Sequence, residues 1–116
     1  MSQLDNSYGP QDSATAVSTT GGKSWVKPRG LLNNWGYTIT TAGSTSTVTS
    51  THRLEGTLSE ATSPVAADIF TLSTGNGAGH VRTTGKIARQ VRINVVTLSS
   101  TSSTGSTLTA VVAGTL

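Results

Sequence analysis

Residues 87–98 contain an alternation of apolar and polar side chains that constrains the fold of this chain more than any other stretch. Arg92 and Asn94 fall on one side of a period-2 pattern. The apolar side chains fall on the other side, and they are Val91, Ile93 and Val95. This pattern predicts a strand with one buried and one solvated face, and β-branched residues suit its packed side.

The alternation slips at Val96, because Val96 and Leu98 take the polar side of the strand. A β-bulge there, or a partner that covers the second face, would explain the slip. A Ser/Thr/Gly turn over residues 99–106 leads to a second predicted strand, 107–114. We expect the two strands to form a hairpin with a long loop. The second strand should point Leu108, Ala110 and Val112 inward.

Further segments of predicted strand fill the middle of the chain, so that we expect about seven strands with turns between them. These segments are 36–41, 45–58, 66–72 and 80–84. Gly56 predicts a bulge or a close backbone approach within its strand. Residues 75–79, with three glycines, predict a hairpin turn rather than a phosphate loop, because a strand and not a helix follows them. The fold class is therefore all-β, as a sandwich or a small barrel.

The first 24 residues hold almost no large apolar side chain. They cannot bury enough surface to offset the entropy of ordering, so we expect an N-terminal arm that is extended or disordered in isolation. The predicted organisation is a flexible arm over 1–24 and one β-sandwich domain over 25–116.

The composition limits the partners. The chain has 116 residues, no cysteine and a net charge of +3, and about a third of the residues are Ser or Thr. Because the eight Lys and Arg residues form no basic run, nucleic-acid binding is disfavoured. No apolar segment follows Met1 and no window could span a membrane, so we expect neither a secretion signal nor membrane insertion.

The densest apolar cluster of the first half runs from Trp25 to Trp35. Pro28 and Gly30 interrupt any regular element there. The tryptophans fit a buried core, but tryptophan is also enriched at binding hot spots. The interface candidates are Trp25, Pro28, Arg29, Leu31, Leu32 and Trp35.

The sequence contains no pattern that specifies a reaction. His52 and His80 lack a third ligand, and a packing or surface role suits them better than a metal site. The acids form no paired-carboxylate pattern, and Glu55 beside Arg53 is typical of a solvated pair. No nucleophile elbow occurs around a serine. We therefore expect a protein without catalytic residues, metal or cofactor.

The order of strands over roughly the last 65 residues resembles small β-sandwich proteins of tailed-bacteriophage virions, including head-decoration, neck and tail or fibre modules. The resemblance rests on 54–57 (Leu-Glu-Gly-Thr), 70–72 (Phe-Thr-Leu), Gly85, 91–95 (Val-Arg-Ile-Asn-Val) and 107–113 (Thr-Leu-Thr-Ala-Val-Val-Ala). It departs from these modules after Thr57, where they often continue with Asp-Gly and a Trp. It implies a jelly-roll-like antiparallel β-sandwich, a pattern that carbohydrate-binding modules share.

The leading hypothesis from this resemblance is a capsid decoration or cement protein, or a neck, tail or fibre component. Its partners would be the major capsid protein or other virion proteins, and it would act as a homo-oligomer, with a trimer favoured. Its location would be the virion, assembled in the host cytoplasm. The alternative is a module that recognises a host glycan, which would need an exposed aromatic platform.

Overall fold

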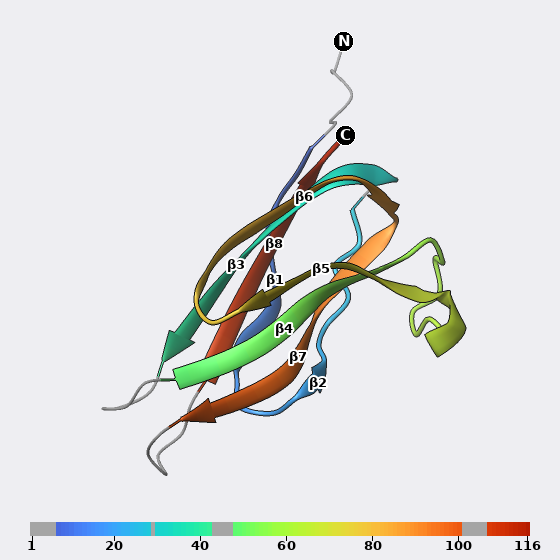
Figure 1. Cartoon of the computed structure of the whole chain (residues 1–116). Helices are drawn as coiled ribbons and strands as arrows, with labels where there is room; N and C mark the ends of the chain where they lie inside the picture. Colours follow the sequence, from blue (N-terminus) through green and yellow to red (C-terminus); the bar gives the residue numbers. More distant parts are fainter. Residues whose placement is uncertain (1–6, 29, 43–47, 101–106) are drawn as a thin grey trace.

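The computed structural model describes residues 7–28, 30–42, 48–100 and 107–116. Two antiparallel sheets of four strands pack face to face (Figure 1). The chain is all-β, as predicted, and the one helical element of its described part is a single turn, η1 (Ala66–Asp68). The strands are β1 (Ser7–Val17), β2 (Gly21–Gly22), β3 (Leu32–Ala42), β4 (Val48–Thr57), β5 (Ile69–Asn76), β6 (Gly79–Ala88), β7 (Gln90–Ser100) and β8 (Thr107–Thr115).

One sheet has the strand order β1-β8-β3-β6 and the other has the order β2-β7-β4-β5. The predicted hairpin between the last two strands is therefore wrong, because β7 and β8 lie in different sheets. The turn after β5 likewise crosses between the sheets and does not close a hairpin. Two strands that are adjacent in the sequence and buried on one face can pair edge to edge or face each other across a core, and here they face each other.

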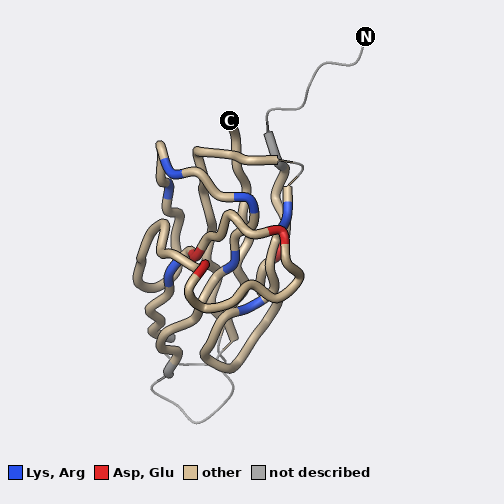
Figure 2. The backbone as a smooth tube through the Cα atoms, turned by 90° about the vertical axis from the view of Figure 1, so that its right-hand side faces the viewer, with Lys and Arg blue, Asp and Glu red and all other residues tan. Residues whose placement is uncertain are grey.

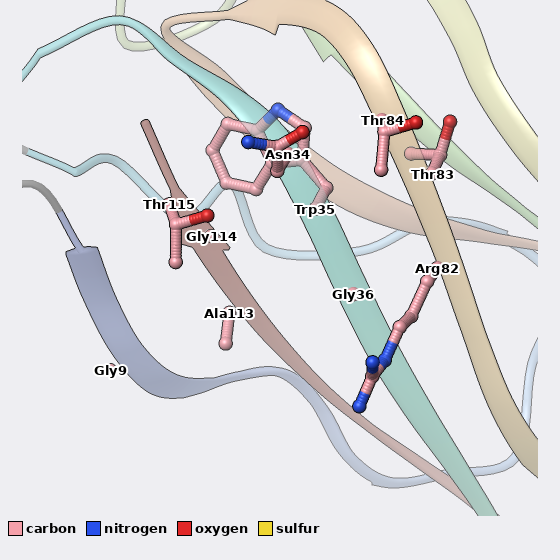
Figure 3. Close-up of a pocket in the computed structure, with 10 residues that line it drawn as sticks. All are labelled: Gly9, Asn34, Trp35, Gly36, Arg82, Thr83, Thr84, Ala113, Gly114 and Thr115. Atoms are coloured by element: carbon pink, nitrogen blue, oxygen red, sulfur yellow. The ribbon is translucent and has the colours of Figure 1, made fainter.

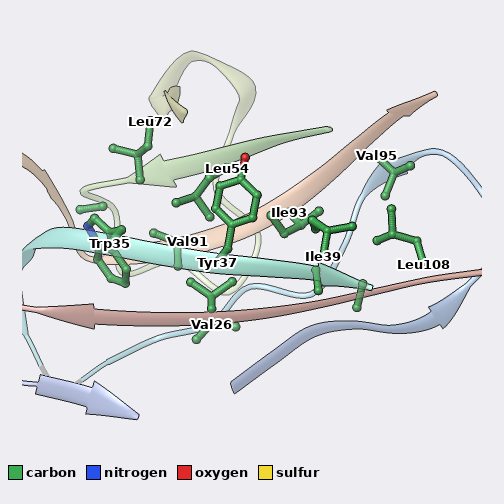
Figure 4. Close-up of a cluster of buried hydrophobic side chains, with 14 of the residues drawn as sticks. Val26, Trp35, Tyr37, Ile39, Leu54, Leu72, Val91, Ile93, Val95 and Leu108 are labelled. Carbon is green, nitrogen blue, oxygen red and sulfur yellow. The ribbon is translucent and has the colours of Figure 1, made fainter. Parts of the chain in front are cut away.

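The core forms where the period-2 apolar faces of the two sheets meet (Figure 4). All six side chains predicted to point inward from β7 and β8 are fully buried: Val91, Ile93, Val95, Leu108, Ala110 and Val112. Tyr37 and Ile39 of β3 join them. Leucines from the facing strands, Leu54 and Leu72, complete the same cluster.

A bulge lies at the position where the alternation in β7 slips. On β4, Thr51 pairs with Thr97 and the next residue, His52, pairs with Val95, so Val96 is the extra residue. Val96 is consequently 46% exposed although it follows a fully buried valine. Gly56 confirms the predicted close approach, since a Cβ atom there would lie 3.0 Å from both Ala88 Cβ and Leu72 Cδ1.

The arm expected over residues 1–24 is described from Ser7 onward, and residues 1–6 lie outside the described residues. From Ser7 onward this stretch pairs with the sandwich, β1 with β8 and β2 with β7. Ser13 and Ala14 are buried although the segment contains almost no large apolar residue. Small side chains can enter a core edge where large ones cannot, and composition alone does not reveal this. The predicted mobility of the segment in isolation stays a prediction.

Ser13 links the two sheets through its hydroxyl group. Ser13 Oγ accepts a hydrogen bond from the Ile93 N–H at 2.9 Å and donates one to the Ser24 carbonyl at 2.8 Å. The Ser24 N–H donates to the Ser13 carbonyl at 3.0 Å. One residue of β1 thus satisfies backbone groups of β7 and of the segment that follows β2.

His52 of β4 is buried in the sandwich and contacts Tyr37 of β3, with the ring centroids 5.4 Å apart and the rings nearly perpendicular. Neither ring nitrogen of His52 has a hydrogen-bond partner among the described residues. Gly75 of β5 packs so close that a Cβ atom there would lie 2.8 Å from His52 Nε2. Burial lowers the pKa of His52, because no neighbouring group compensates the desolvated imidazolium.

We expect the stability of the protein to fall as the pH is lowered below about 6.5, the pKa of an unperturbed histidine. At lower pH the His52 imidazole binds a proton in the unfolded chain but stays neutral in the folded protein. Stability is therefore lost on acidification by up to about 1.4 kcal/mol per pH unit. The groups that surround His52 are Tyr37, Gly75 and the paired Val95, and none carries a negative charge at this pH. Urea denaturation between pH 7 and pH 5 measures the effect.

Replacing His52 with Phe should remove most of this decline. The control is His80→Gln, which changes an exposed histidine and should leave the decline in place. An equal pH dependence in the parent and in His52→Phe would contradict the assignment.

Candidate functional site

The six predicted interface residues do not form one surface. Leu32 and Trp35 are buried in the core, and Pro28 is buried as well. Leu31 is 42% exposed, Trp25 is half-buried, and Arg29 lies outside the described residues. Within the predicted set, Trp25 and Leu31 are therefore the described side chains that can meet a partner.

Trp35 fills the core below the outer surface of its sheet. Its indole N–H donates a hydrogen bond to the Lys86 carbonyl at 3.2 Å, and its ring packs on Gly114 of β8. A Cβ atom at Gly114 would lie only 2.7 Å from the Trp35 ring, so that glycine provides the space for the indole. Trp35 has the structural role that is usual for a buried tryptophan.

Trp25 lies on the outer face of the sheet that contains β7. The segment after β2 runs along β7, where Val26 and Val91 exchange backbone hydrogen bonds of 2.7 and 3.0 Å. Val26 points into the core, and its neighbour Trp25 contacts the solvated face. The Arg92 guanidinium lies 4.6 Å from the centroid of the Trp25 ring, a cation–π contact.

Beneath this contact, the buried carboxylate of Glu55 on β4 holds a network of charged and polar side chains. Its side chain is 7% exposed and accepts hydrogen bonds from Arg53 Nε and Arg92 Nε, both at 2.9 Å. Asn94 Nδ2 donates a third at 3.2 Å. Glu55 and Arg53 therefore pair as predicted, but only the Arg53 side chain is solvated, and the Glu55 side chain is buried. The missing partner was Arg92, which lies directly opposite Glu55 in the β4–β7 register.

The network holds its side chains in place. Three donors occupy the Glu55 carboxylate, two of them arginines whose hydrogen bonds to it are charge-assisted. Its effect is to fix Arg92 between the carboxylate and the Trp25 ring. Gly22 of β2 adds to this, because a Cβ atom there would collide with the Arg92 guanidinium. We define the group formed by Trp25, Arg53, Glu55, Arg92 and Asn94 as the Trp25 cluster.

A second surface feature lies on the outer face of the opposite sheet. It is a shallow hollow of about 510 Å³ over β3, β8 and β6, in which Gly36, Ala113 and Arg82 are prominent (Figure 3). It differs from the Trp25 cluster in that its arginine has no acidic partner among the described residues.

The histidines are not brought together. His52 is inside the sandwich, whereas exposed His80 lies across from Thr38, whose Oγ1 is 2.8 Å from His80 Nδ1. The part of the chain that the structure describes contains no group of three His, Cys, Asp or Glu side chains able to hold a metal ion. In the same residues no helix is long and apolar enough to cross a membrane.

Among the described residues, the lysine and arginine positions are scattered along the chain in the view of Figure 2. In comparisons with known proteins, no protein-family model matches this chain and the curated proteins contain no detectable relative.

We expect Glu55→Gln to destabilise the fold by about 1.5–3 kcal/mol, the range for a lost hydrogen bond to a charged group. The substitution keeps the size of the side chain but removes the charge that holds Arg53 and Arg92. Urea denaturation measures the stability, and the fluorescence of Trp25 reports the release of Arg92.

The matched control is Glu60→Gln. Glu60 pairs with Arg89 at 3.2 Å, but its side chain is 68% exposed, so its loss should cost less than about 0.5 kcal/mol. Equal costs at the two positions would show that burial of Glu55 adds nothing.

Proposed function

We propose that this chain is a non-enzymatic structural protein of a tailed-bacteriophage virion, which decorates and cements the capsid surface. Its partners are the major capsid protein or other virion proteins. It works as a homo-oligomer, with a trimer as the favoured state, and is located in the virion after assembly in the host cytoplasm. The resemblance of its strand pattern to virion β-sandwich modules motivates this proposal.

The pairing of the strands supports a jelly-roll topology, which the proposal includes. The first strand pairs with the eighth, the second with the seventh, the third with the sixth and the fourth with the fifth. Such nested pairing is what a long hairpin gives when it rolls up into two sheets of four strands. Eight strands in two sheets are also the number expected of a jelly roll.

The observation that carries the proposal is the Trp25 cluster. Tryptophan and arginine are the residue types that dominate the energy of protein interfaces. Here a buried carboxylate fixes Arg92 against Trp25, so the contact surface loses little side-chain entropy when a partner binds. Arg53, whose side chain is 43% exposed, borders the same surface. The cluster suits a rigid protein partner better than a reaction.

An open strand edge supports self-association. β2 pairs with β7 only at Val95 and Asn94. Beyond Val95, no strand in the described residues pairs with that side of β7, while Val96 stays 46% exposed. An unpaired edge with few charges is a surface on which a second copy can add. The proposed homo-oligomer would cover this edge.

Two other functions are alternatives to capsid decoration. A neck, tail or fibre component would use the same surfaces on a different part of the particle. A glycan-binding module is favoured instead by the hollow at Gly36, although the Trp25 ring offers a poor sugar platform because Arg92 covers one of its faces.

We expect the purified protein to be oligomeric in light scattering and to co-sediment with bare capsids. Trp25→Ala should weaken capsid binding at least tenfold, as is typical for a tryptophan hot spot. Val65→Ala is the control, because Val65 is 63% exposed in the segment before η1, away from the cluster. Circular dichroism would verify that both variants fold.

A stable monomer that binds no particle would refute the structural role and promote the glycan-binding alternative. Co-sedimentation that Trp25→Ala leaves unchanged would refute the assignment of the Trp25 cluster as the contact surface.

A further inference from the structure

The hollow on the β1-β8-β3-β6 sheet arises from a row of very small residues across the strands. The register places Gly36 of β3 opposite Ala113 of β8 on one side and Arg82 of β6 on the other. Gly9 of β1 also lines the hollow. The sheet face is dented at Gly36 and Ala113, because the side chains of the flanking rows rise above these small residues.

The flanking rows consist mainly of hydrogen-bonding side chains. On one side the register aligns Asn34 with Thr84 and with Thr115, and all three line the hollow. On the other side it aligns Thr38 with His80 and with Val111. Asn34 Nδ2 donates to Asn33 Oδ1 at 3.1 Å. The side-chain oxygen of Asn34, Oδ1, is left able to accept a hydrogen bond.

Arg82 gives the hollow its charge. Its aliphatic stem lies over Gly36, since a Cβ atom there would be 3.8 Å from Arg82 Cγ, and its guanidinium extends across the sheet face (Figure 3). Among the described residues, ion pairs occupy Arg53, Arg89 and Arg92, but none occupies Arg82. Asp12 is the one carboxylate in the described parts of these four strands, and it pairs with Val111, at the β1 end of one of the flanking rows.

We propose that this hollow binds a carboxylate-bearing saccharide. The guanidinium of Arg82 would take the carboxylate, for which its paired N–H groups are suited. The amide of Asn34 and the hydroxyls of Thr84 and Thr115 would take sugar hydroxyls. The volume of about 510 Å³ lies in the range of small-ligand sites.

A peptide partner suits the hollow less well. A peptide commonly binds a sheet by adding a strand to a free edge. β3 and β8 are both central strands with neighbours on either side, so their backbone groups are occupied. Recognition at this place must come from side chains, and those present are polar or very small. This inference is independent of the proposed capsid role.

The test uses the full chain and two trisaccharides of one linkage, trigalacturonate and its uncharged galactose counterpart. Titration followed by backbone amide NMR should give saturable shifts at Gly36, Arg82 and Ala113 with the acidic sugar. The neutral sugar should bind at least tenfold more weakly, because it leaves Arg82 without a counter-charge. Sodium acetate and inorganic phosphate form further arms, and each should compete poorly.

Two variants test the site itself. Arg82→Gln should weaken binding at least tenfold. Gly36→Ala fills the floor with a methyl group, and the nearest atoms to that methyl would be 3.6 and 3.8 Å away, which is ordinary contact. This variant should therefore fold normally and still bind several-fold more weakly. Lys27→Gln is the matched control, because it removes one exposed positive charge elsewhere.

The proposal is overturned if trigalacturonate gives no saturable shifts at these amides, or if both trisaccharides bind equally. It is also overturned if Lys27→Gln weakens binding as much as Arg82→Gln does, since the attraction would then be a non-specific charge effect. Equal affinity for acetate or phosphate would reduce the hollow to a simple anion site and exclude saccharide recognition.

Discussion

The contact between the buried faces of β7 and β8 is the constraint on which the rest of the structure depends. The two strands lie in different sheets, and side chains at alternate positions are fully buried over residues 91–95 of β7 and 108–112 of β8. A shift of either strand by one residue would turn that apolar face to solvent, so this contact sets the register of both sheets. The bulge at Val96 adds one unpaired residue to β7 at the point where the alternation of apolar and polar residues slips.

Small residues let a polar chain build a core of this kind. Only 34% of the residues are hydrophobic, so close packing has to replace a large apolar volume. Glycines provide it at three places: Gly56 admits Leu72 and Ala88, Gly75 admits Tyr37 and His52, and Gly114 admits Trp35. A Cβ atom at any of these positions would displace a buried neighbour. At Gly36 and Ala113 the small residues lie on the outer face of the sheet, and there they leave the hollow.

The sequence predicted what depends on local pattern. The all-β class, the inward faces of β7 and β8, the bulge near Val96 and the close approach at Gly56 all follow from spacing within one strand. Pairing does not follow from spacing, because it depends on which strands meet after the chain rolls up. The hairpin prediction failed for this reason.

The candidate site shows the same limit. Arg53 and Glu55 are two residues apart in the sequence, and their proximity was evident. Arg92 is opposite Glu55 only through the β4–β7 register, and Trp25 reaches Arg92 only because the chain after β2 follows β7. Leu32 and Trp35 were candidates by residue type, yet they point into the core. The strand register, rather than the composition, decides which candidate side chains can face a partner and which lie in the core. The register also brings Gly36 and Ala113 side by side, where the hollow lies.

The central claim is that β1 is an integral part of the sandwich, held by the Ser13 hydroxyl between Ile93 and Ser24. Native-state hydrogen exchange of the isolated protein tests it most directly, because the Ile93 amide donates to a side chain and not to a sheet partner. The account predicts that this amide and those of β1 that bond to β8 are protected together with the core strands. It also predicts that Ser13→Ala removes the protection at Ile93 selectively. Rapid exchange throughout residues 7–17 in the parent protein would contradict the account and favour the predicted flexible arm.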